Sequence, residues 1–153
     1  MGMAAVYLAG ILFLLGAGPP SPVKPESVTL RGKVMPLAAA FQSLGLDVQP
    51  DVDSLAHQVV LLGEDRSITP LLSDDASRAL FRDSRLQKRP TEIKGLRYPG
   101  VPYLQVTTFR IEQEGRLQTP EYYCSICTIS VRSPQTCPCC QGPMELRMKP
   151  DRP

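Results

Sequence analysis

Apolar and polar residues alternate along much of the chain in patterns that are typical of short β-strands. Between residues 27 and 34, the apolar residues Val28 and Leu30 stand at every second position, which predicts a strand with one buried face. The same interpretation extends to four further apolar stretches that are bounded by turn-forming residues. These predicted strands span residues 58–62, 68–72, 91–98 and 103–112.

Two segments between these strands have helical spacing instead. Leu37, Phe41 and Leu44 are spaced four and three residues apart, so they share one face of a helix, and a glycine follows as a stop signal. A second helix is predicted to start at residues 73–75, where a serine and two aspartates can cap the free amides, and to end before Pro90. The chain is therefore predicted to be mainly β with short helices.

The order of these elements is strand, helix, strand, strand, helix, strand, strand. This order resembles the OB-fold, a five-stranded barrel whose helix lies between the third and fourth strands, over residues 27–117. The resemblance implies a closed OB-like barrel, in which the strand glycines Gly32 and Gly95 mark bulges or bends. A small α+β domain with an open antiparallel sheet is the alternative.

The N-terminal region has the pattern of a targeting segment. Residues 4–18 are apolar or small without interruption, and the first charged side chain is Lys24. The length of the apolar run is typical of a signal peptide and short for a membrane span. We therefore expect residues 1–18 to be an apolar helix that serves as a signal peptide or a membrane anchor, and residues 19–26 to be a proline-rich linker. The protein is expected to be exported, periplasmic or extracytoplasmic, with membrane contact through residues 4–18; a buried core helix is the alternative.

All five cysteines lie in the C-terminal part of the chain. Cys124 and Cys127 form one Cys-x-x-Cys pair, and Cys137 and Cys140 form a second. Two thiolates three positions apart on a tight turn can share one ion, and two such turns supply the four sulfurs of a structural zinc site. These four cysteines are the predicted metal ligands. The fifth, Cys139, lies inside the second pair and is expected to be dispensable for the metal.

The residues around the two pairs resemble zinc-ribbon and rubredoxin-like modules over residues 121–148. A proline inside the second pair and Gly142 just past it fit the tight turns of such modules, and strands are expected to leave the turns at residues 128–131 and 144–147. Thr128 stands where rubredoxin-type iron sites usually have glycine, so Zn²⁺ is favoured over iron. Disulfides or a redox dithiol are the alternative, because an exported protein meets oxidising conditions.

Charge and other reactive residues point to no further site. The net charge is +2, from 17 basic and 15 acidic residues. Arg78, Arg82 and Arg85 have the spacing of one helix face, which we interpret as a solvated surface rather than as a nucleic-acid or headgroup site. His57 is the only histidine, so a catalytic triad is not expected.

The whole pattern, a signal-like N-terminus followed by an OB-like barrel and a zinc ribbon, resembles small exported bacterial proteins without an established activity. It favours a non-enzymatic, exported or membrane-tethered binding or scaffold protein with a structural zinc site, whose partner is a protein or a small ligand. Two alternatives stay open. The first is an envelope thiol-disulfide or metal-handling protein that uses its Cys-x-x-Cys pairs. The second is a nucleic-acid-binding protein, which requires that the apolar N-terminal run is not a targeting segment.

Overall fold

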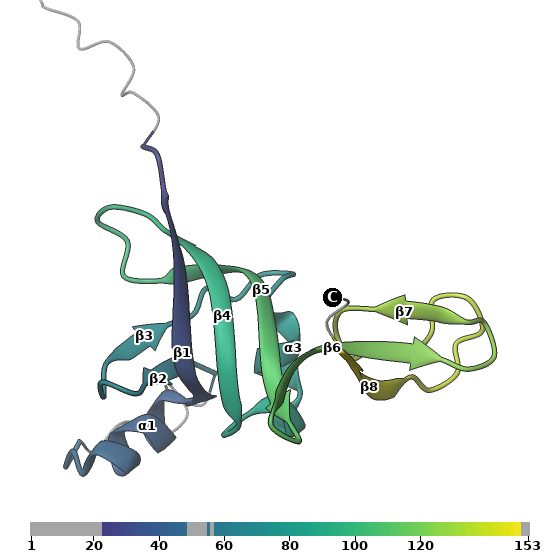
Figure 1. Cartoon of the computed structure of the whole chain (residues 1–153), viewed down its shortest axis with the longest axis horizontal. Helices are drawn as coiled ribbons and strands as arrows, with labels where there is room; N and C mark the ends of the chain where they lie inside the picture. The colour runs from purple at the N-terminus through teal and green to yellow at the C-terminus, as the bar shows by residue number, and fades with distance from the viewer. Residues whose placement is uncertain (1–22, 49–54, 56, 151–153) are drawn as a thin grey trace, which may run out of the picture.

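A computed structural model describes residues 23–48, 55 and 57–150 of the chain, and antiparallel β-structure dominates this part (Figure 1). Seven strands follow one another in the order β3-β2-β1-β4-β5-β6-β7, and an eighth strand, β8, pairs with β6. The strands are β1 (Glu26–Pro36), β2 (Val59–Gly63), β3 (Ile68–Pro70), β4 (Pro90–Arg97), β5 (Leu104–Gln113), β6 (Arg116–Cys124), β7 (Ile129–Val131) and β8 (Glu145–Pro150). The helices are short: α1 (Leu37–Leu44), α3 (Arg78–Arg82) and the 3₁₀ turn η1 (Ser84–Leu86). The prediction of a mainly β chain with short helices is confirmed.

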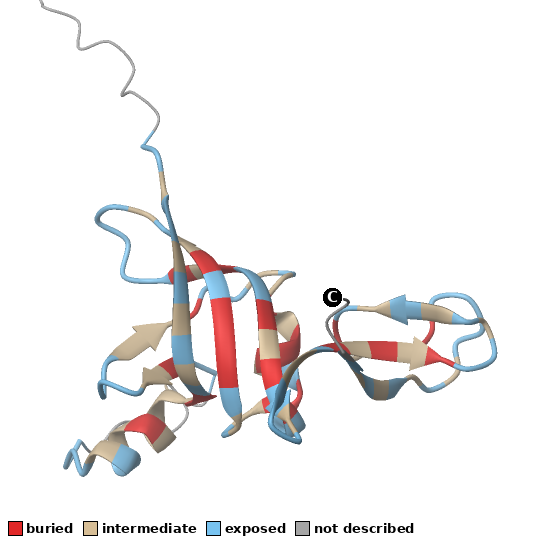
Figure 2. Cartoon of the chain, in the orientation of Figure 1, coloured by how far each residue is buried: buried red, intermediate tan, exposed pale blue. Residues whose placement is uncertain are grey.

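Strands β1 to β5 form a sheet body with its own hydrophobic core, whereas β6, β7 and β8 extend away from it as a narrow ribbon (Figure 1). Fully buried side chains from β1, β4 and β5 lie on one face of the sheet body, among them Val34, Ile93 and Ile111. Leu80 of α3 and Leu86 of η1 pack against the same cluster. In Figure 2 buried residues recur along β4 and β5, and β4 carries a continuous buried stretch because Glu92 is covered on the opposite face.

The closed barrel that the element order predicts is not formed. The predicted order of elements is observed, but β3 and β5, the two edge strands of the sheet body, form no continuous ladder with each other. The only pairing between these edges among the described residues is an isolated parallel bridge from Leu71 to Leu104. The physical reason is that β3 is three residues long and ends in Pro70, which has no N–H to offer a second partner. The sheet is therefore open.

The N-terminal helix predicted for residues 1–18 lies outside the described residues. No helix in the part of the chain that the structure describes is long and apolar enough to cross a membrane.

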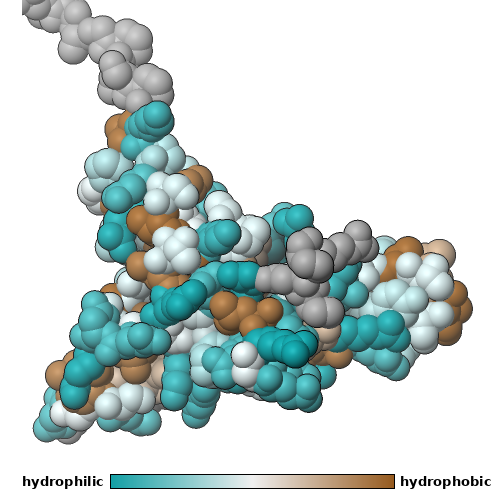
Figure 3. Space-filling view, viewed as in Figure 1, coloured by the Kyte–Doolittle hydropathy of each residue, from teal (hydrophilic) through white to brown (hydrophobic). Residues whose placement is uncertain are grey.

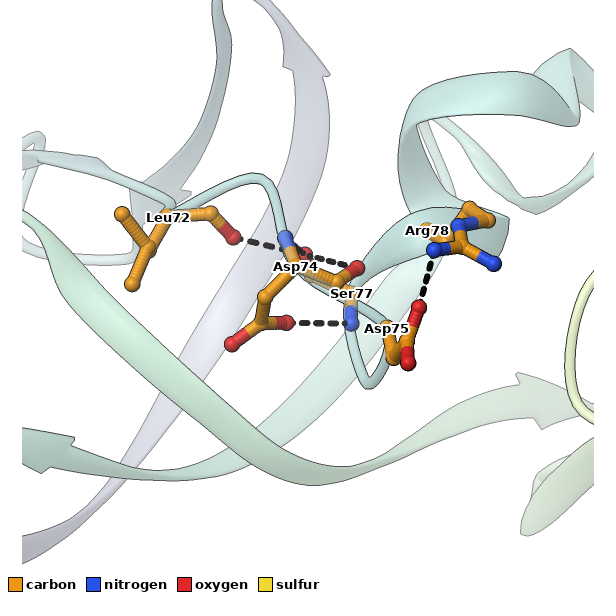
Figure 4. A network of polar contacts seen from close by, with 5 residues as sticks. All are labelled: Leu72, Asp74, Asp75, Ser77 and Arg78. Carbon is orange, nitrogen blue, oxygen red and sulfur yellow. Dashed lines mark hydrogen bonds and ion pairs between the residues drawn. The ribbon is translucent and has the colours of Figure 1, made fainter.

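The two internal helices differ in how well the sequence placed them. Helix α1 follows Pro36 and ends at Gly45, whose φ of 68° gives the left-handed stop that was expected. Helix α3 begins at Arg78 instead of at residues 73–75. The segment before it is a hydrogen-bonded turn, in which the Asp74 carboxylate accepts from the Ser77 amide at 3.0 Å (Figure 4).

This turn is fixed by a buried hydroxyl. Ser77 is fully buried, and its hydroxyl donates to the Leu72 carbonyl at 2.6 Å while it accepts from the Asp74 amide at 3.0 Å. Asp75 forms an ion pair with Arg78 on the outside of the turn (Figure 4). The aspartates therefore close a turn before the helix, and no side chain caps the helix itself.

The three arginines expected on one helix face are separated by the end of α3. Arg78 and Arg82 belong to α3, whereas Arg85 lies in η1, beyond an extended residue, Asp83, with φ of −118° and ψ of 102°. Arg85 turns back and forms an ion pair with Asp83 at 2.6 Å. A common face for the three is thus not formed.

Candidate metal centre

The four candidate ligands lie at the end of the ribbon that is remote from the sheet body. Cys124 is the last residue of β6, and Cys127 lies in the turn between β6 and β7. Cys137 and Cys140 lie in the connection between β7 and β8. Because β7 and β8 both pair with the same end of β6, their connection is brought back to the first cysteine pair.

The sulfurs of the two pairs meet in one cluster. The Sγ atoms of Cys124, Cys127, Cys137 and Cys140 all lie within 4.8 Å of one another, and the Cys124 and Cys140 sulfurs are 3.6 Å apart. In a tetrahedral site with Zn–S bonds of about 2.3 Å, neighbouring sulfurs are about 3.8 Å apart. Because a disulfide requires an S–S distance of about 2.0 Å, these sulfurs are unbonded, and all five cysteines are free thiols. The cluster suggests a zinc-ribbon-like site.

Both cysteine pairs stand on turns of the same kind. The Thr128 amide donates to the Cys124 carbonyl at 2.8 Å, and the Gln141 amide donates to the Cys137 carbonyl at 2.9 Å. Thr128 and Gln141 follow the second cysteine of their pairs, and their φ angles are 56° and 59°. This left-handed conformation is the one that glycine adopts most easily, and it is strained for a β-branched residue. The turn therefore forms with Thr128 at the position after Cys127 where rubredoxin-type sites usually have glycine.

Backbone amides also point toward the cluster. The Cys127 amide donates to the Cys124 sulfur at 3.4 Å. The pKa of Cys137 is lowered to about 7, chiefly by a hydrogen bond from the Cys140 backbone and further by one from the Cys139 backbone. Amides that stabilise a thiolate also suit a metal-bound sulfur, since only the thiolate is a ligand.

The ligand set is buried on one side and accessible on the other. Cys124 and Cys137 are buried, Cys127 is partly exposed, and Cys140 is exposed. Cys139 is exposed and does not belong to the group of four, but its thiol, followed by that of Cys140, raises the pKa of Cys127. The fifth sulfur thus lies close to the cluster on its accessible side.

A buried polar contact connects the ribbon to the sheet body. The Tyr122 hydroxyl donates to the Asp83 carboxylate at 2.7 Å, and both residues are buried. Arg85 donates to the same carboxylate through Nε at 2.9 Å and through Nη2 at 2.6 Å. Tyr122 is two positions before Cys124 on β6, so both side chains are buried on one face of the strand. Apart from the position of a tyrosine beside the first cysteine pair, no pattern in the amino-acid sequence points to this contact.

A second buried carboxylate lies on the other face of the sheet body. Glu92 of β4 is buried and receives bonds from Arg31 of β1 at 2.8 and 2.9 Å. It also forms an ion pair with Arg110 of β5. The three residues stand opposite one another in the strand register, so the pairs cross-link three neighbouring strands. Because the positive charges of Arg31 and Arg110 both face the Glu92 carboxylate, we interpret these three residues as a structural cluster.

The remaining sequence candidates do not converge on a site. His57 is exposed, and it is the only histidine of the chain. Asp74 and Asp75 close the turn before α3. The cysteine cluster is therefore the one candidate site that the sequence predicted and the described residues bring together. In comparisons with known proteins, no family model, curated protein or solved structure matches this chain.

Proposed function

We propose that this protein is a non-enzymatic binding or scaffold protein whose ribbon is folded around one structural zinc ion, held by Cys124, Cys127, Cys137 and Cys140. The observation that carries the proposal is the meeting of four sulfurs within 4.8 Å, at the spacing of a tetrahedral S₄ shell. Four protein ligands leave no open position on the metal, so the ion would act as a cross-link rather than as a catalyst.

The burial pattern of the ribbon supports a structural role for the metal. Beyond Tyr122, which packs in the core of the sheet body, the buried residues of the ribbon are Pro120, Cys124, Ser133 and Cys137. The ribbon therefore has almost no apolar interior of its own, and β7 is only three residues long. A module of this kind depends on a metal or disulfides for its stability. Zinc fits the ligand set better than iron does, because four thiolates in a tetrahedron satisfy it without a redox change.

The cellular location belongs to the same proposal. The uncharged apolar run at residues 4–18 and the proline-rich segment after it support export, with the chain either released by cleavage or tethered to the membrane. The partner is then an extracytoplasmic protein or small ligand, and nucleic acid is not expected there.

Substitution of single cysteines tests the metal site. Serine in place of Cys124, Cys127, Cys137 or Cys140 should each lower zinc in the purified full chain from one ion to well below one. Cys139→Ser is the matched control, because this thiol is exposed and outside the group of four, and it should retain the metal. X-ray absorption of the loaded protein should give four sulfurs at about 2.3 Å. Full zinc retention in all five variants would refute the ligand assignment.

The exposure of Cys139 and Cys140 favours one second candidate, a thiol-disulfide or metal-handling protein of the envelope. Thiol counting on protein purified from an oxidising compartment separates the two functions. Counted after unfolding with a chelator, a structural zinc site gives one metal ion and five thiols per chain, whereas a redox protein gives no metal, two disulfides and a single thiol, because five cysteines leave one unpaired.

A further inference from the structure

The end of the sheet body where the described chain begins carries an unusual group of exposed apolar side chains. Val23 is 61% exposed, Leu72 is 41%, Val101 is 47% and Tyr103 is 40% exposed. Val23 precedes β1, Leu72 follows β3, and Val101 and Tyr103 belong to the loop between β4 and β5. In Figure 3 hydrophobic residues stand among hydrophilic ones near the point where the described chain starts.

Strand pairing places these three segments at the same end. The register opposes Glu26, at the start of β1, to Arg97, at the end of β4, so the loop that follows Arg97 lies beside the entry of the chain. The Leu72 amide donates to the Leu104 carbonyl at 2.9 Å, which fixes the segment after β3 beside the start of β5. In Figure 1 the β4–β5 loop and the first residues of β1 lie together, away from the ribbon.

The loop is held in one conformation. The Val101 amide donates to the Tyr98 carbonyl at 3.1 Å, and Gly100 between them has a φ of 77°. Pro99 and Gly100 occupy the two central positions of this turn, which is the preferred sequence of a type II turn. The Tyr98 hydroxyl donates to the side chain of Gln105 at 3.1 Å and ties the turn to β5. Val101 is therefore held outward, and little conformational freedom is lost when it is covered.

Two cations flank the apolar residues. Lys24 and Arg97 are exposed, and with Tyr98 and Val101 they line a shallow recess of about 480 Å³. Neither cation forms an ion pair with another described residue. Glu26 is the one acidic residue that lines the recess, so the balance there is positive.

The chain that precedes Val23 brings a lipid surface within reach of this end. The uncharged apolar run ends at Gly18, five residues before Val23. Five residues span at most about 18 Å even when fully extended. If residues 4–18 enter a bilayer, the sheet end that begins at Val23 has to lie close to the lipid headgroups.

We propose that this end of the sheet body contacts an anionic lipid surface. We call it the headgroup face, and it consists of Val23, Lys24, Leu72, Arg97, Val101 and Tyr103. Tyrosine, short apolar side chains and lysine or arginine are the residues that proteins use at membrane interfaces, and the two cations are attracted to anionic lipids. The inference rests on the membrane tether included in the proposed function.

A second copy of the chain fits this surface less well. A stable protein interface covers about 800 Å² on each partner, whereas the headgroup face offers four apolar side chains that are each only partly exposed. A symmetric contact would also bring Lys24 and Arg97 of one copy close to the same two cations of the other copy. Glu26 is the one acidic residue of the recess that could offset this repulsion.

The experiment uses tryptophan as a reporter, because the chain contains none. The full chain carrying Val101→Trp is reconstituted with vesicles of equal parts phosphatidylcholine and phosphatidylglycerol, with and without brominated acyl chains. We expect the emission of the Val101→Trp chain to shift to the blue and to be quenched by the brominated lipid. Ile126→Trp is the matched control, because Ile126 lies in the turn between the first two cysteines and is 77% exposed. Its emission should stay at the long wavelength of water-exposed tryptophan, without quenching. In the Val101→Trp background, Lys24→Glu with Arg97→Glu should reduce the quenching to the level of this control.

The outcomes separate the headgroup face from the tether. If the chain floats with the vesicles and the tryptophan at position 101 is unquenched, the headgroup face is wrong while the tether stands. If the chain stays in solution and that tryptophan is unquenched, both are wrong. Quenching without flotation supports the headgroup face and refutes the tether. A blue shift that grows with protein concentration in the absence of vesicles assigns the face to a second copy and overturns the lipid proposal.

Discussion

The contact between Tyr122 and Asp83 should contribute measurably to the free energy of unfolding. The Tyr122 hydroxyl lies 2.7 Å from the Asp83 carboxylate, both groups are buried, and they are 39 residues apart in sequence. A hydrogen bond to a charged acceptor contributes about 1.5–3 kcal/mol. In Tyr122→Phe, Asp83 keeps its bonds from Arg85, so the carboxylate is not left without partners. We therefore expect a loss near the lower end of this range, about 2 kcal/mol.

A double-mutant cycle with Asp83→Ala isolates the pair, because alanine offers the Tyr122 hydroxyl no side-chain acceptor. The single variants, the double variant and the wild type are unfolded with urea at pH 7 in the presence of zinc, and the coupling energy should be about 1.5 kcal/mol. The hydrogen bond from Arg85 lowers the pKa of Asp83 from 3.8 to about 2. A carboxyl group with a lowered pKa stabilises the fold above its unfolded pKa, and this contribution is lost as the pH falls toward 2. At pH 7 it is fully present.

Tyr123→Phe is the matched control for this cycle. Tyr123 is the next residue of β6, is only partly buried, and has the Arg147 guanidinium 3.7 Å from its ring centre. Loss of its hydroxyl leaves that stacking in place, so its effect should stay below about 0.5 kcal/mol. A coupling energy between Tyr122 and Asp83 below about 0.5 kcal/mol would refute the view that this bond attaches the ribbon to the sheet body.

Three further predictions follow from strain and charge. Thr128→Gly should stabilise the zinc-loaded ribbon by roughly 1 kcal/mol, because φ is 56° at that position, and chelator competition should show slower zinc loss; faster loss would contradict the strain. Arg85→Ala should lower the free energy of unfolding by about 1 kcal/mol, because it leaves the buried carboxylate of Asp83 without its cation. Arg82→Ala breaks no ion pair among the described residues, so its effect should stay within about 0.5 kcal/mol. Equal effects of the two variants in urea unfolding would contradict this. Hydrogen bonds from Arg110 and then Arg31 lower the pKa of Glu92, so the stability deficit of Glu92→Gln in thermal unfolding should shrink as the pH falls below 4.5, and a deficit that is constant with pH would argue against these pairs.

Local chemistry explains what could be predicted from the sequence. A Cys-x-x-Cys spacing places two sulfurs on one turn whatever the rest of the chain does, so the two pairs could be found without knowledge of the fold. The strand at residues 27–34 and the helix that stops at Gly45 were likewise visible, because alternation and a left-handed glycine are local signals. These signals give the face that each residue presents and say nothing about the partner it meets.

The open sheet and the buried carboxylates depend on partners that are distant in sequence. Whether β3 pairs with β5 and closes the barrel depends on the short length of β3, three residues, and on Pro70. The order of the strands along the sequence gives no measure of either effect. Glu92 is 61 residues from Arg31, and only the register of β1 against β4 brings them together. A local stretch of sequence does not contain both partners of such a contact, so local patterns cannot predict it.

Strand β6 was missed for a related reason. Pro120 lies in its interior, and a proline inside an apolar run argues against a strand. In the structure Pro120 is buried and stands opposite Met148 of β8. The strand runs from its pairing with β5 directly into the ribbon, across the junction expected near residues 117–121.

The continuity of β6 changes how the metal should influence the rest of the protein. The same strand face that buries Cys124 buries Tyr122, which packs in the core of the sheet body and bonds to Asp83. Loss of the proposed zinc ion would also remove the constraint on the end of this strand, two residues from the buried tyrosine. The proposed ion would therefore stabilise more than the turns that hold it, since its effect would reach the sheet body through the Tyr122 side chain, and the Tyr122 cycle measures the strength of this link.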